Sequence, residues 1–135
     1  MRLAVLDTNV IVSAGVKPDG IPRLVVERML LGEAHIVTCP GVLDEYIDVM
    51  QRAKFTRYTF PPPWLGSLIE ESIHVPDPEP WPYALPDPDD RIFIALAHAS
   101  GAPLITGNLR HFPPSARGGV KVLSPADYLA QLTGS

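Results

Sequence analysis

Short apolar runs alternate with helix-forming segments along the chain, and this alternation limits the fold more than any other feature of the sequence. Runs of strand length that are mostly apolar stand at residues 3–6, 34–39, 73–75, 103–106 and 119–123. The first run has no polar residues, as expected for a strand buried on both faces, and we interpret residues 10–12 as its extension after a polar break. The pattern predicts an α/β fold with a parallel sheet of four to five strands, covered by helices on both faces.

Helix signals lie between these runs. Pro22 stands in the first turn of a predicted helix at residues 21–31, Gly32 ends that helix, and Pro40 opens another that reaches about residue 54. Further helices are predicted at residues 64–73, 90–100 and 125–132. The segment 75–88 contains six prolines, which lack the amide donor, so we expect an ordered extended loop there.

Composition bounds the class of protein. The 135 residues are 46% hydrophobic and 19% charged, which predicts one globular domain over residues 1–135. The net charge of −4 gives no general attraction to nucleic acid, so RNA binding would need a local basic patch or bound cations. Cys39 is the single cysteine, which excludes an internal disulfide and suits a reducing cytosol. We expect a cytoplasmic protein, because the first residues make a poor signal peptide and no apolar stretch nears the roughly 18 residues that span a bilayer.

Acidic residues stand where predicted elements begin or end. Asp7 directly follows the first strand, where the open end of a sheet tolerates a charge, although Asp-Thr-Asn is also good turn chemistry. In the helix that begins at Pro40, Glu45 lies at the edge of the apolar stripe, whereas Asp44 and Asp48 lie roughly opposite it and are expected to face solvent. Glu45 is therefore the acid of this helix that is expected to reach a cleft beside the core, although an ordinary glutamate at the boundary of the core would have the same position.

A second acidic group, at residues 87–90, precedes the buried helix predicted at residues 90–100. Asp87 as N-cap and Pro88 at the first helical position make a good helix start, which is a sufficient structural role for these residues. Asp90 comes directly before the apolar run and is the candidate site residue of this group. Asn108 follows another predicted strand and adds an amide at the same side of the sheet.

These positions predict a metal site. Ligands bind to parallel α/β sheets beyond the carboxyl ends of the strands, so Asp7, Glu45 and Asp90 are expected to converge there. Clustered carboxylates repel one another unless cations bind between them, and Mg²⁺ and Mn²⁺ take oxygen ligands of this kind. An ion so held activates water and stabilises charge on a phosphate, so phosphoryl transfer is the predicted chemistry.

Four segments in order, LDTNV, LDEY, DPDDRIFIALA and TGNLRHF, resemble the PIN domain and, more narrowly, the VapC-type toxins of bacterial toxin–antitoxin pairs. The resemblance covers nearly the whole chain. It implies a three-layer fold with a central parallel sheet flanked by helices, and Mg²⁺- or Mn²⁺-dependent cleavage of RNA by three or four acids. Carried over, Asp7, Glu45 and Asp90 are the catalytic acids, Asp7 and Asp90 hold the metal, and Asn108 stands where a fourth acid is common.

The resemblance also implies partners. Asn9, Thr106 and His111 are the expected substrate contacts; His111 stands where many relatives have another acid. A cognate antitoxin is the expected protein partner. A homodimer is expected too, from the resemblance and from an apparent excess of apolar helix in a small chain.

A basic and aromatic segment, QRAKFTRYTF, follows the helix that carries Glu45. Its cations and aromatic rings suit phosphate contact and base stacking, although a solvated helix end or a protein interface would have the same composition. The candidate RNA contacts are Arg52, Lys54, Phe55, Arg57 and Tyr58.

Other functions have less support. A Rossmann dehydrogenase lacks its G-x-G-x-x-G here, a P-loop is also missing, and an aspartyl phosphatase lacks a convincing lysine partner. A pure interaction module would leave the acids without a purpose. A catalytically weak PIN domain that binds RNA or protein without cutting remains the main alternative, because Asn108 carries no charge.

Overall fold

The computed structural model of the chain describes residues 2–52 and 61–134. Its centre is a five-stranded sheet in the order β3-β2-β1-β4-β5, and each neighbouring pair is parallel. The strands are β1 (Leu3–Leu6), β2 (His35–Thr38), β3 (Ile73–His74), β4 (Leu104–Ile105) and β5 (Val122–Leu123). The predicted parallel α/β sheet of four to five strands is confirmed.

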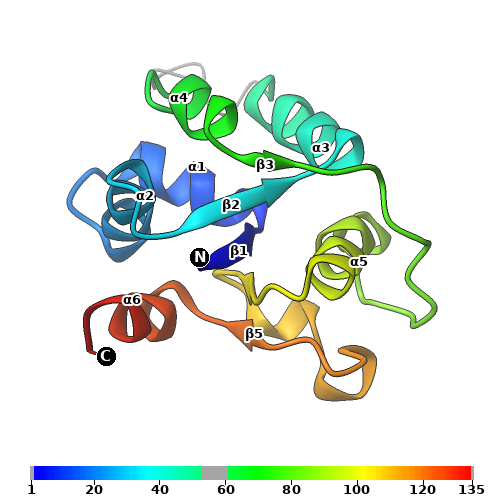
Figure 1. Cartoon of the computed structure of the whole chain (residues 1–135). Coiled ribbons are helices and arrows are strands. Elements are labelled where there is room, and N and C mark those ends of the chain that lie inside the picture. The colour runs from blue at the N-terminus through cyan, green and yellow to red at the C-terminus, as the bar shows by residue number, and fades with distance from the viewer. Residues whose placement is uncertain (1, 53–60, 135) are drawn as a thin grey trace.

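Helices flank this sheet (Figure 1). Helix α5 packs against β1, β2 and β4, α4 packs against β2, and α6 packs against β5. The helices are α1 (Thr8–Val16), α2 (Ile21–Leu30), α3 (Pro40–Met50), α4 (Leu65–Glu70), α5 (Arg91–Ser100) and α6 (Pro125–Gly134). Within residues 2–52 and 61–134, the short 3-10 turns are η2 (Pro88–Asp90), η3 (Leu109–His111) and η4 (Pro114–Ala116). No helix among the described residues has the length and apolar character needed to cross a membrane.

Helix α1 corrects the sequence analysis, which interpreted residues 10–12 as an extension of the first strand. The chain leaves β1 at Leu6, and the amide of Val10 then donates to the Asp7 carbonyl at 3.0 Å, which closes the first turn of a helix. Val10, Ile11 and Ala14 are buried, a spacing that fits one helical face. A short run of β-branched residues is compatible with either a strand or a buried helix. Here the burial of these side chains on one face favours the helix.

The other boundaries differ by a few residues. Gly32 adopts a φ of 84° after α2, and Gly101 a φ of 68° after α5, so each helix ends at a residue that tolerates left-handed backbone. The helix predicted at residues 64–73 is shorter, because the chain turns at Ser72 and enters β3 at Ile73.

The proline-rich segment 75–88 forms the ordered extended loop that its composition predicts. Two contacts hold it in place. The Asp77 carboxylate accepts a hydrogen bond from the Gly41 amide at 2.8 Å, and the buried Trp81 ring donates through Nε1 to the Ala116 carbonyl at 2.9 Å. The loop is therefore tied to α3 at one point and to η4 at another.

Candidate active site

The carboxyl ends of β1 and β4 place Asp7 in the interior of the molecule. Val5 and Leu6 pair with Leu104 and Ile105, and the Asp7 amide continues the pairing by donating to the Ile105 carbonyl at 2.9 Å. The chain then turns into α1, so the Asp7 side chain lies at the carboxyl end of the central strand. It is only 4% exposed. A buried carboxylate requires hydrogen-bond donors or a cation.

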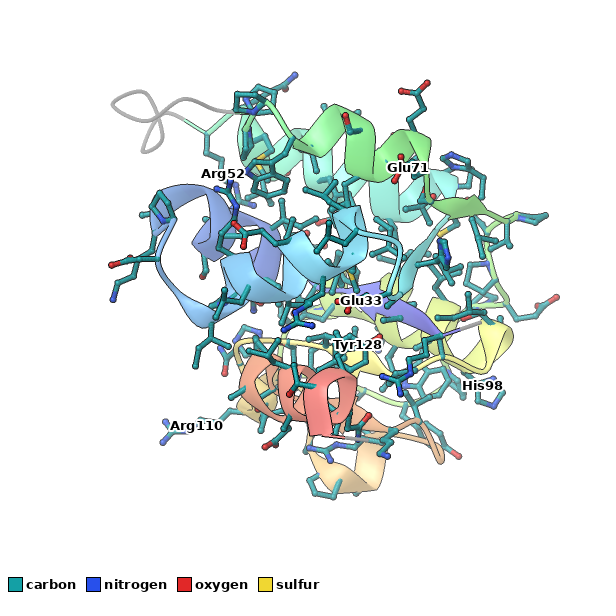
Figure 2. The ribbon with its side chains drawn as sticks, turned by 60° about the vertical axis from the view of Figure 1, so that its left-hand side comes forward. Glu33, Arg52, Glu71, His98, Arg110 and Tyr128 are labelled. Atoms are coloured by element: carbon teal, nitrogen blue, oxygen red, sulfur yellow. The ribbon has the colours of Figure 1, made fainter. Side chains whose placement is uncertain are left out.

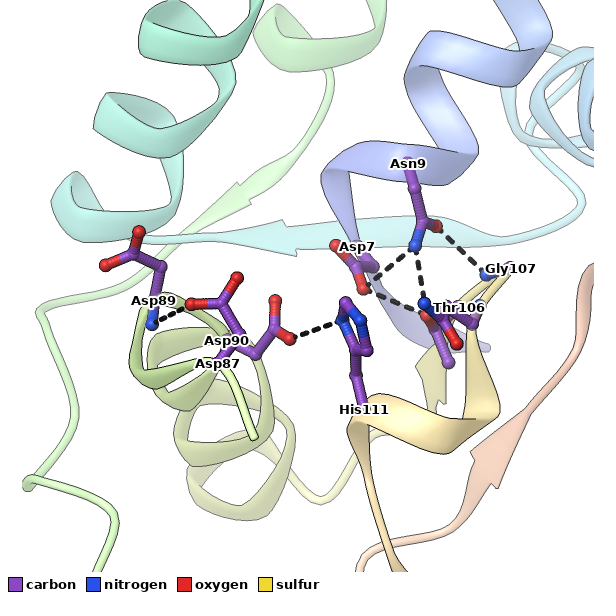
Figure 3. Close-up of polar contacts among 9 residues, drawn as sticks. Asp7, Asn9, Asp87, Asp89, Asp90, Thr106, Gly107 and His111 are labelled. Atoms are coloured by element: carbon purple, nitrogen blue, oxygen red, sulfur yellow. Dashed lines mark hydrogen bonds and ion pairs between the residues drawn. The ribbon is translucent and has the colours of Figure 1, made fainter. Parts of the chain in front are cut away.

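Polar neighbours supply the donors (Figure 3). The Thr106 hydroxyl donates to Asp7 Oδ2 at 2.9 Å, and Asn9 Nδ2 approaches the same oxygen at 3.3 Å. The backbone amide of Asn108 in turn donates to the Thr106 hydroxyl, and the backbone amide of Gly107 donates to Asn9 Oδ1. Asn9 and Thr106, two of the expected substrate contacts, therefore bind Asp7 directly.

Asp90 reaches the same region from the turn before α5. The Asp87 side chain caps this turn, as predicted, by accepting a hydrogen bond from the Asp89 amide at 3.0 Å. Asp90 is 8% exposed, and its Oδ2 lies 2.9 Å from Nδ1 of His111. Apart from this contact, the buried Oδ2 atom has no hydrogen-bond partner in the described part of the chain.

Burial raises the pKa of both carboxyls. For Asp7 the increase is opposed by the hydrogen bond from Thr106. For Asp90, burial and the nearby negative charge of Asp7 raise the pKa to about 6, against a smaller opposing effect of His111. When two neighbouring carboxyls have raised pKa values, a cation between them strongly stabilises their ionised forms.

Glu45 faces the same space from α3. The neighbouring Tyr46 ring is fully buried, and its hydroxyl donates to the Leu6 carbonyl at 2.7 Å, which fixes α3 beside the end of β1. Glu45 is half-buried, and burial followed by the charge of Asp89 raises its pKa. Asp44 is exposed, as the helical projection predicts. The projection did not identify Tyr46 as a positioning residue, although a hydroxyl within an apolar stripe requires a buried partner.

One cleft of about 380 Å³ collects these side chains. All the expected site residues line it except Thr106, which lies fully buried behind Asp7. The acids and amides of its wall are Asp7, Asn9, Glu45, Asp87, Asp89, Asp90 and Asn108. As the side chains lie, no three Asp, Glu, His or Cys residues in the described regions are close enough to share a metal ion.

Two basic side chains also line the cleft, Arg52 just after α3 and His111 in η3. Arg52 lies 3.8 Å from the exposed Asp48 carboxylate. Arg110, next to His111, instead points away from the body of the molecule (Figure 2). Four other predicted RNA contacts, at residues 54, 55, 57 and 58, lie outside the described residues.

The donor set fits a hard divalent cation. The cleft offers several carboxylate and amide oxygens, of which one buried carboxylate oxygen has only an imidazole beside it. Magnesium and manganese ions take such oxygens together with water and phosphate oxygens. A phosphodiester would be repelled by these acids, and a bound cation would offset that repulsion.

Residues 3–110 match the PIN domain family. The fold is similar to that of VapBC2 from Rickettsia felis, solved bound to a DNA fragment from their promoter, with 16% identity over 90% of this chain and 98% of that chain and a TM-score of 0.64. FitAcB from Neisseria gonorrhoeae shares 16% identity over 91% and 98% of the two chains, with a TM-score of 0.54. PAE2754 from Pyrobaculum aerophilum shares 13% identity over 99% and 91%, with a TM-score of 0.56. No curated protein sequence matches the chain.

Proposed function

The chain belongs to the PIN domain family, and from this membership we propose that it is a metal-dependent ribonuclease that cleaves single-stranded RNA as the toxin of a toxin–antitoxin pair. One observation carries the proposal: Asp7, Glu45 and Asp90 come from three separate elements and line the same cleft. A structural role explains each acid alone, but it does not explain why several negative charges share one half-buried space.

Asp7 and Asp90 are the residues proposed to hold the ion. They are the most buried acids of the cleft, and burial raises the pKa of each, so both gain most from a neighbouring positive charge. Thr106 and Asn9 keep the Asp7 carboxylate in one orientation through their hydrogen bonds. Glu45 is more exposed, and its proposed role is to bind the attacking water or to accept its proton. Asn108 would offer a neutral oxygen to the ion.

A bound Mg²⁺ or Mn²⁺ would lower the pKa of a water molecule and stabilise charge on the scissile phosphate. The basic side chain proposed to contact the RNA backbone in this cleft is Arg52, whose guanidinium lies 3.8 Å from the exposed Asp48 carboxylate. An exposed ion pair at this distance is weak, so Arg52 can exchange Asp48 for a phosphate at little cost.

The test is cleavage of single-stranded RNA in a metal titration. The wild-type protein is expected to cut only with added Mg²⁺ or Mn²⁺ and to stop with EDTA. Asp7→Asn and Asp90→Asn should abolish cutting, because each removes a charge that holds the ion. Asp127→Asn, which changes an exposed acid of α6, is the matched control and should keep full activity. Cleavage that survives both Asp7→Asn and EDTA would instead indicate a contaminating nuclease or a metal-free reaction.

A catalytically weak PIN domain that binds without cutting is the second candidate. Asn108 favours it, because this residue lines the cleft and adds no charge to the site. Because Asn108 lines the cleft, Asn108→Asp should then raise metal affinity and activity. Wild-type protein that binds a broad panel of RNAs but never cuts any of them would establish the binding module.

The toxin role rests on the resemblance to VapC-type toxins and on the fold shared with VapBC2 and FitAcB. Expression of the wild-type chain without its antitoxin is expected to arrest bacterial growth, and expression of Asp7→Asn at the same level is not. Equal growth of the two strains, with both proteins soluble and folded, would contradict this role.

A further inference from the structure

We propose that the side of the cleft formed by α1 and α3 is a subsite for one base of the RNA substrate, and that this base rests on Val12 and Val49. The inference rests on the proposed ribonuclease function and deepens it, because it states where the nucleotide next to the cleaved phosphate binds. Helix α1 leads away from Asp7 and α3 carries Glu45, so the subsite borders the proposed reaction centre.

The side chains that line the cleft differ in charge from one element to another. Three acids come from η2 and its N-cap, namely Asp87, Asp89 and Asp90. A second set, which we call the α1–α3 wall, comes from the two helices and from the residue just after α3, and its members are Val12, Ser13, Val49 and Arg52. This wall has two apolar side chains, one hydroxyl and one positive charge, so it does not repel the RNA backbone as the acids of η2 do.

Helical spacing brings the two valines to the cleft. Val49 lies four residues after Glu45 and three before Arg52, so all three share one helix face. Val12 lies three residues after Asn9, and both line the cleft from α1. Because α1 packs against α3, the two valines form an apolar stretch of the cleft that begins beside the site residues.

A nucleobase is the part of RNA that matches this stretch. Val12 and Val49 are half-buried, so each keeps apolar surface that faces the cleft, and the buried Phe93 ring lines the cleft as well. A base has flat apolar faces and polar edges, whereas ribose and phosphate are polar throughout. The exposed hydroxyl of Ser13 offers both a donor and an acceptor to a base edge.

The size and the end of the wall also fit a single nucleotide. The cleft volume of about 380 Å³ is near the lower limit of the roughly 300–1,000 Å³ range of small-ligand pockets, so it suits one nucleotide of a single strand. Arg52 stands beyond Val49, and its exposed ion pair with Asp48, at 3.8 Å, is weak. A nucleotide whose base rests on the valines can therefore present a phosphate to Arg52.

Another pocket competes for the base. Beside the proline-rich loop, the Trp81 ring makes edge contacts with Tyr83 and His98, at centroid distances of 5.7 and 5.5 Å, and all three rings line a pocket of about 420 Å³. Aromatic rings suit base stacking. However, neither Asp7 nor Asp90 lines this pocket, so a base bound there would not lie next to the cleaved phosphate.

The experiment uses adenosine and uridine as probes, because a nucleoside carries a base but no phosphate, needs no metal and is not cleaved. Binding to the wild-type protein in EDTA is followed by NMR of the valine methyl groups, with ribose as the control ligand. The signals of Val12 and Val49 should shift in the ring current of the bound base. The signals of Val75, which does not line the cleft, should stay in place, and ribose should shift none of them.

Val49→Ser should weaken nucleoside binding about three- to tenfold, because it removes apolar surface from the contact. Ile47→Ser is the matched control, since Ile47 is an exposed apolar residue of the same helix that does not line the cleft. In RNA cleavage with metal, Val49→Ser should raise KM more than it lowers kcat, as expected when a contact to the substrate is lost away from the reacting atoms. Circular dichroism and thermal unfolding establish that each variant is folded.

The contrary outcomes separate this inference from the proposed function. Nucleosides that shift the signals of Tyr83 and His98 but not those of the valines would place the base beside the proline-rich loop and overturn the subsite. Nucleosides that shift no signal at millimolar concentration, or that bind equally to the wild type and Val49→Ser, would also overturn it, even if the wild type cleaves RNA. Valine shifts in a protein that never cleaves RNA would support the subsite and contradict the ribonuclease.

Discussion

Two buried threonine hydroxyls lie next to the catalytic candidates, and they differ in one respect. Thr106 Oγ1 donates to Asp7 and accepts from the Asn108 amide, whereas the buried Thr8 Oγ1 has no hydrogen-bond partner in the described part of the chain. Substituting each threonine therefore distinguishes two contributions to the free energy of unfolding: the hydrogen bond to Asp7 and the cost of burying a hydroxyl.

Thr106→Val should destabilise the protein by about 1–3 kcal/mol, because it removes the shorter side-chain hydrogen bond to the buried Asp7 carboxylate and the acceptor of the Asn108 backbone amide. Thr8→Val should leave the free energy of unfolding unchanged or slightly raised, since it removes a hydroxyl that bonds to nothing. Urea unfolding of both variants at pH 7 in EDTA tests the pair. Equal losses from the two substitutions would show that the Thr106 bond contributes nothing.

Asp90→Asn should stabilise the metal-free protein at neutral pH. The raised pKa of about 6, against an ordinary 3.8, means that the folded protein binds a proton more tightly than the unfolded chain does. The contribution of protonated Asp90 to the stability of the wild type is therefore fully present below about pH 4. It is lost as the pH rises to about 6. At pH 7 the variant should therefore exceed the wild type by roughly 1–3 kcal/mol in free energy of unfolding.

Unfolding in urea and EDTA at pH 4, 5.5 and 7 measures this difference, with Asp127→Asn as control. The gap between Asp90→Asn and the wild type should open as the pH rises through this range. A gap of the same size at pH 4 and pH 7 would contradict the assignment. A stabilised but inactive variant would also show that the site trades stability for function.

At the scale of elements, the close approach of α3 and α5 depends on a glycine. A Cβ on Gly41 would lie 3.0 Å from the Ile92 side chain and 3.2 Å from Asp77 Oδ1. The same glycine donates its amide to Asp77, so α3, α5 and the proline-rich loop meet at this point. Glu45 lies one turn further along α3, so its place in the cleft follows from this contact.

Gly41→Ala should lower the free energy of unfolding by about 1 kcal/mol, because the added methyl group pushes α3 away from α5. Gly66→Ala in α4 is the matched control. Its Cβ meets nothing within 4 Å, so alanine should stabilise the helix by up to about 1 kcal/mol. In an Ile92→Ala background the cost of Gly41→Ala should fall, because only the contact with Asp77 Oδ1 then remains, and an unchanged cost would rule out the contact with Ile92 as its cause.

The sequence predicted the strands well and the contacts between elements poorly. Apolar runs and helix signals located all five strands, acids at element ends led to Asp7 and Asp90, and the helical projection led to Glu45. The bonds that orient the acids remained hidden, because Thr106 and Asp7 are 99 residues apart and nothing local in either segment indicates the pairing. Helix α1 was missed for a related reason, since Val10 and Ile11 suit a strand until packing is known.

At the scale of the whole molecule, several large apolar side chains remain exposed. Leu31 is 77% exposed and Ile47 is 55% exposed, whereas the helical projection had placed Ile47 within the apolar stripe of α3. Ile21 and Leu24 on α2 are each 44% exposed. Exposed apolar groups of this size favour association with another surface.

We therefore predict a homodimer for the isolated protein. Sedimentation equilibrium at tens of micromolar should give a mass near twice 14.7 kDa, because association would cover part of this apolar surface. The dimer should persist at high salt, as expected for an apolar interface. A monomer at these concentrations would count against the prediction.

The strand order has a consequence for how the protein is made. β1 lies at the centre of the sheet and leads directly to Asp7, but its partner β4 and the Thr106 hydroxyl are synthesised about 100 residues later. At about 5–20 residues per second, a ribosome exposes the first half of the cleft roughly 5–20 seconds before the second. A nascent chain, or a fragment released before residue 106, therefore lacks the hydroxyl that orients Asp7. For a protein proposed to cut RNA, attack on any transcript must therefore wait until residue 106 has been synthesised and β4 has paired with β1.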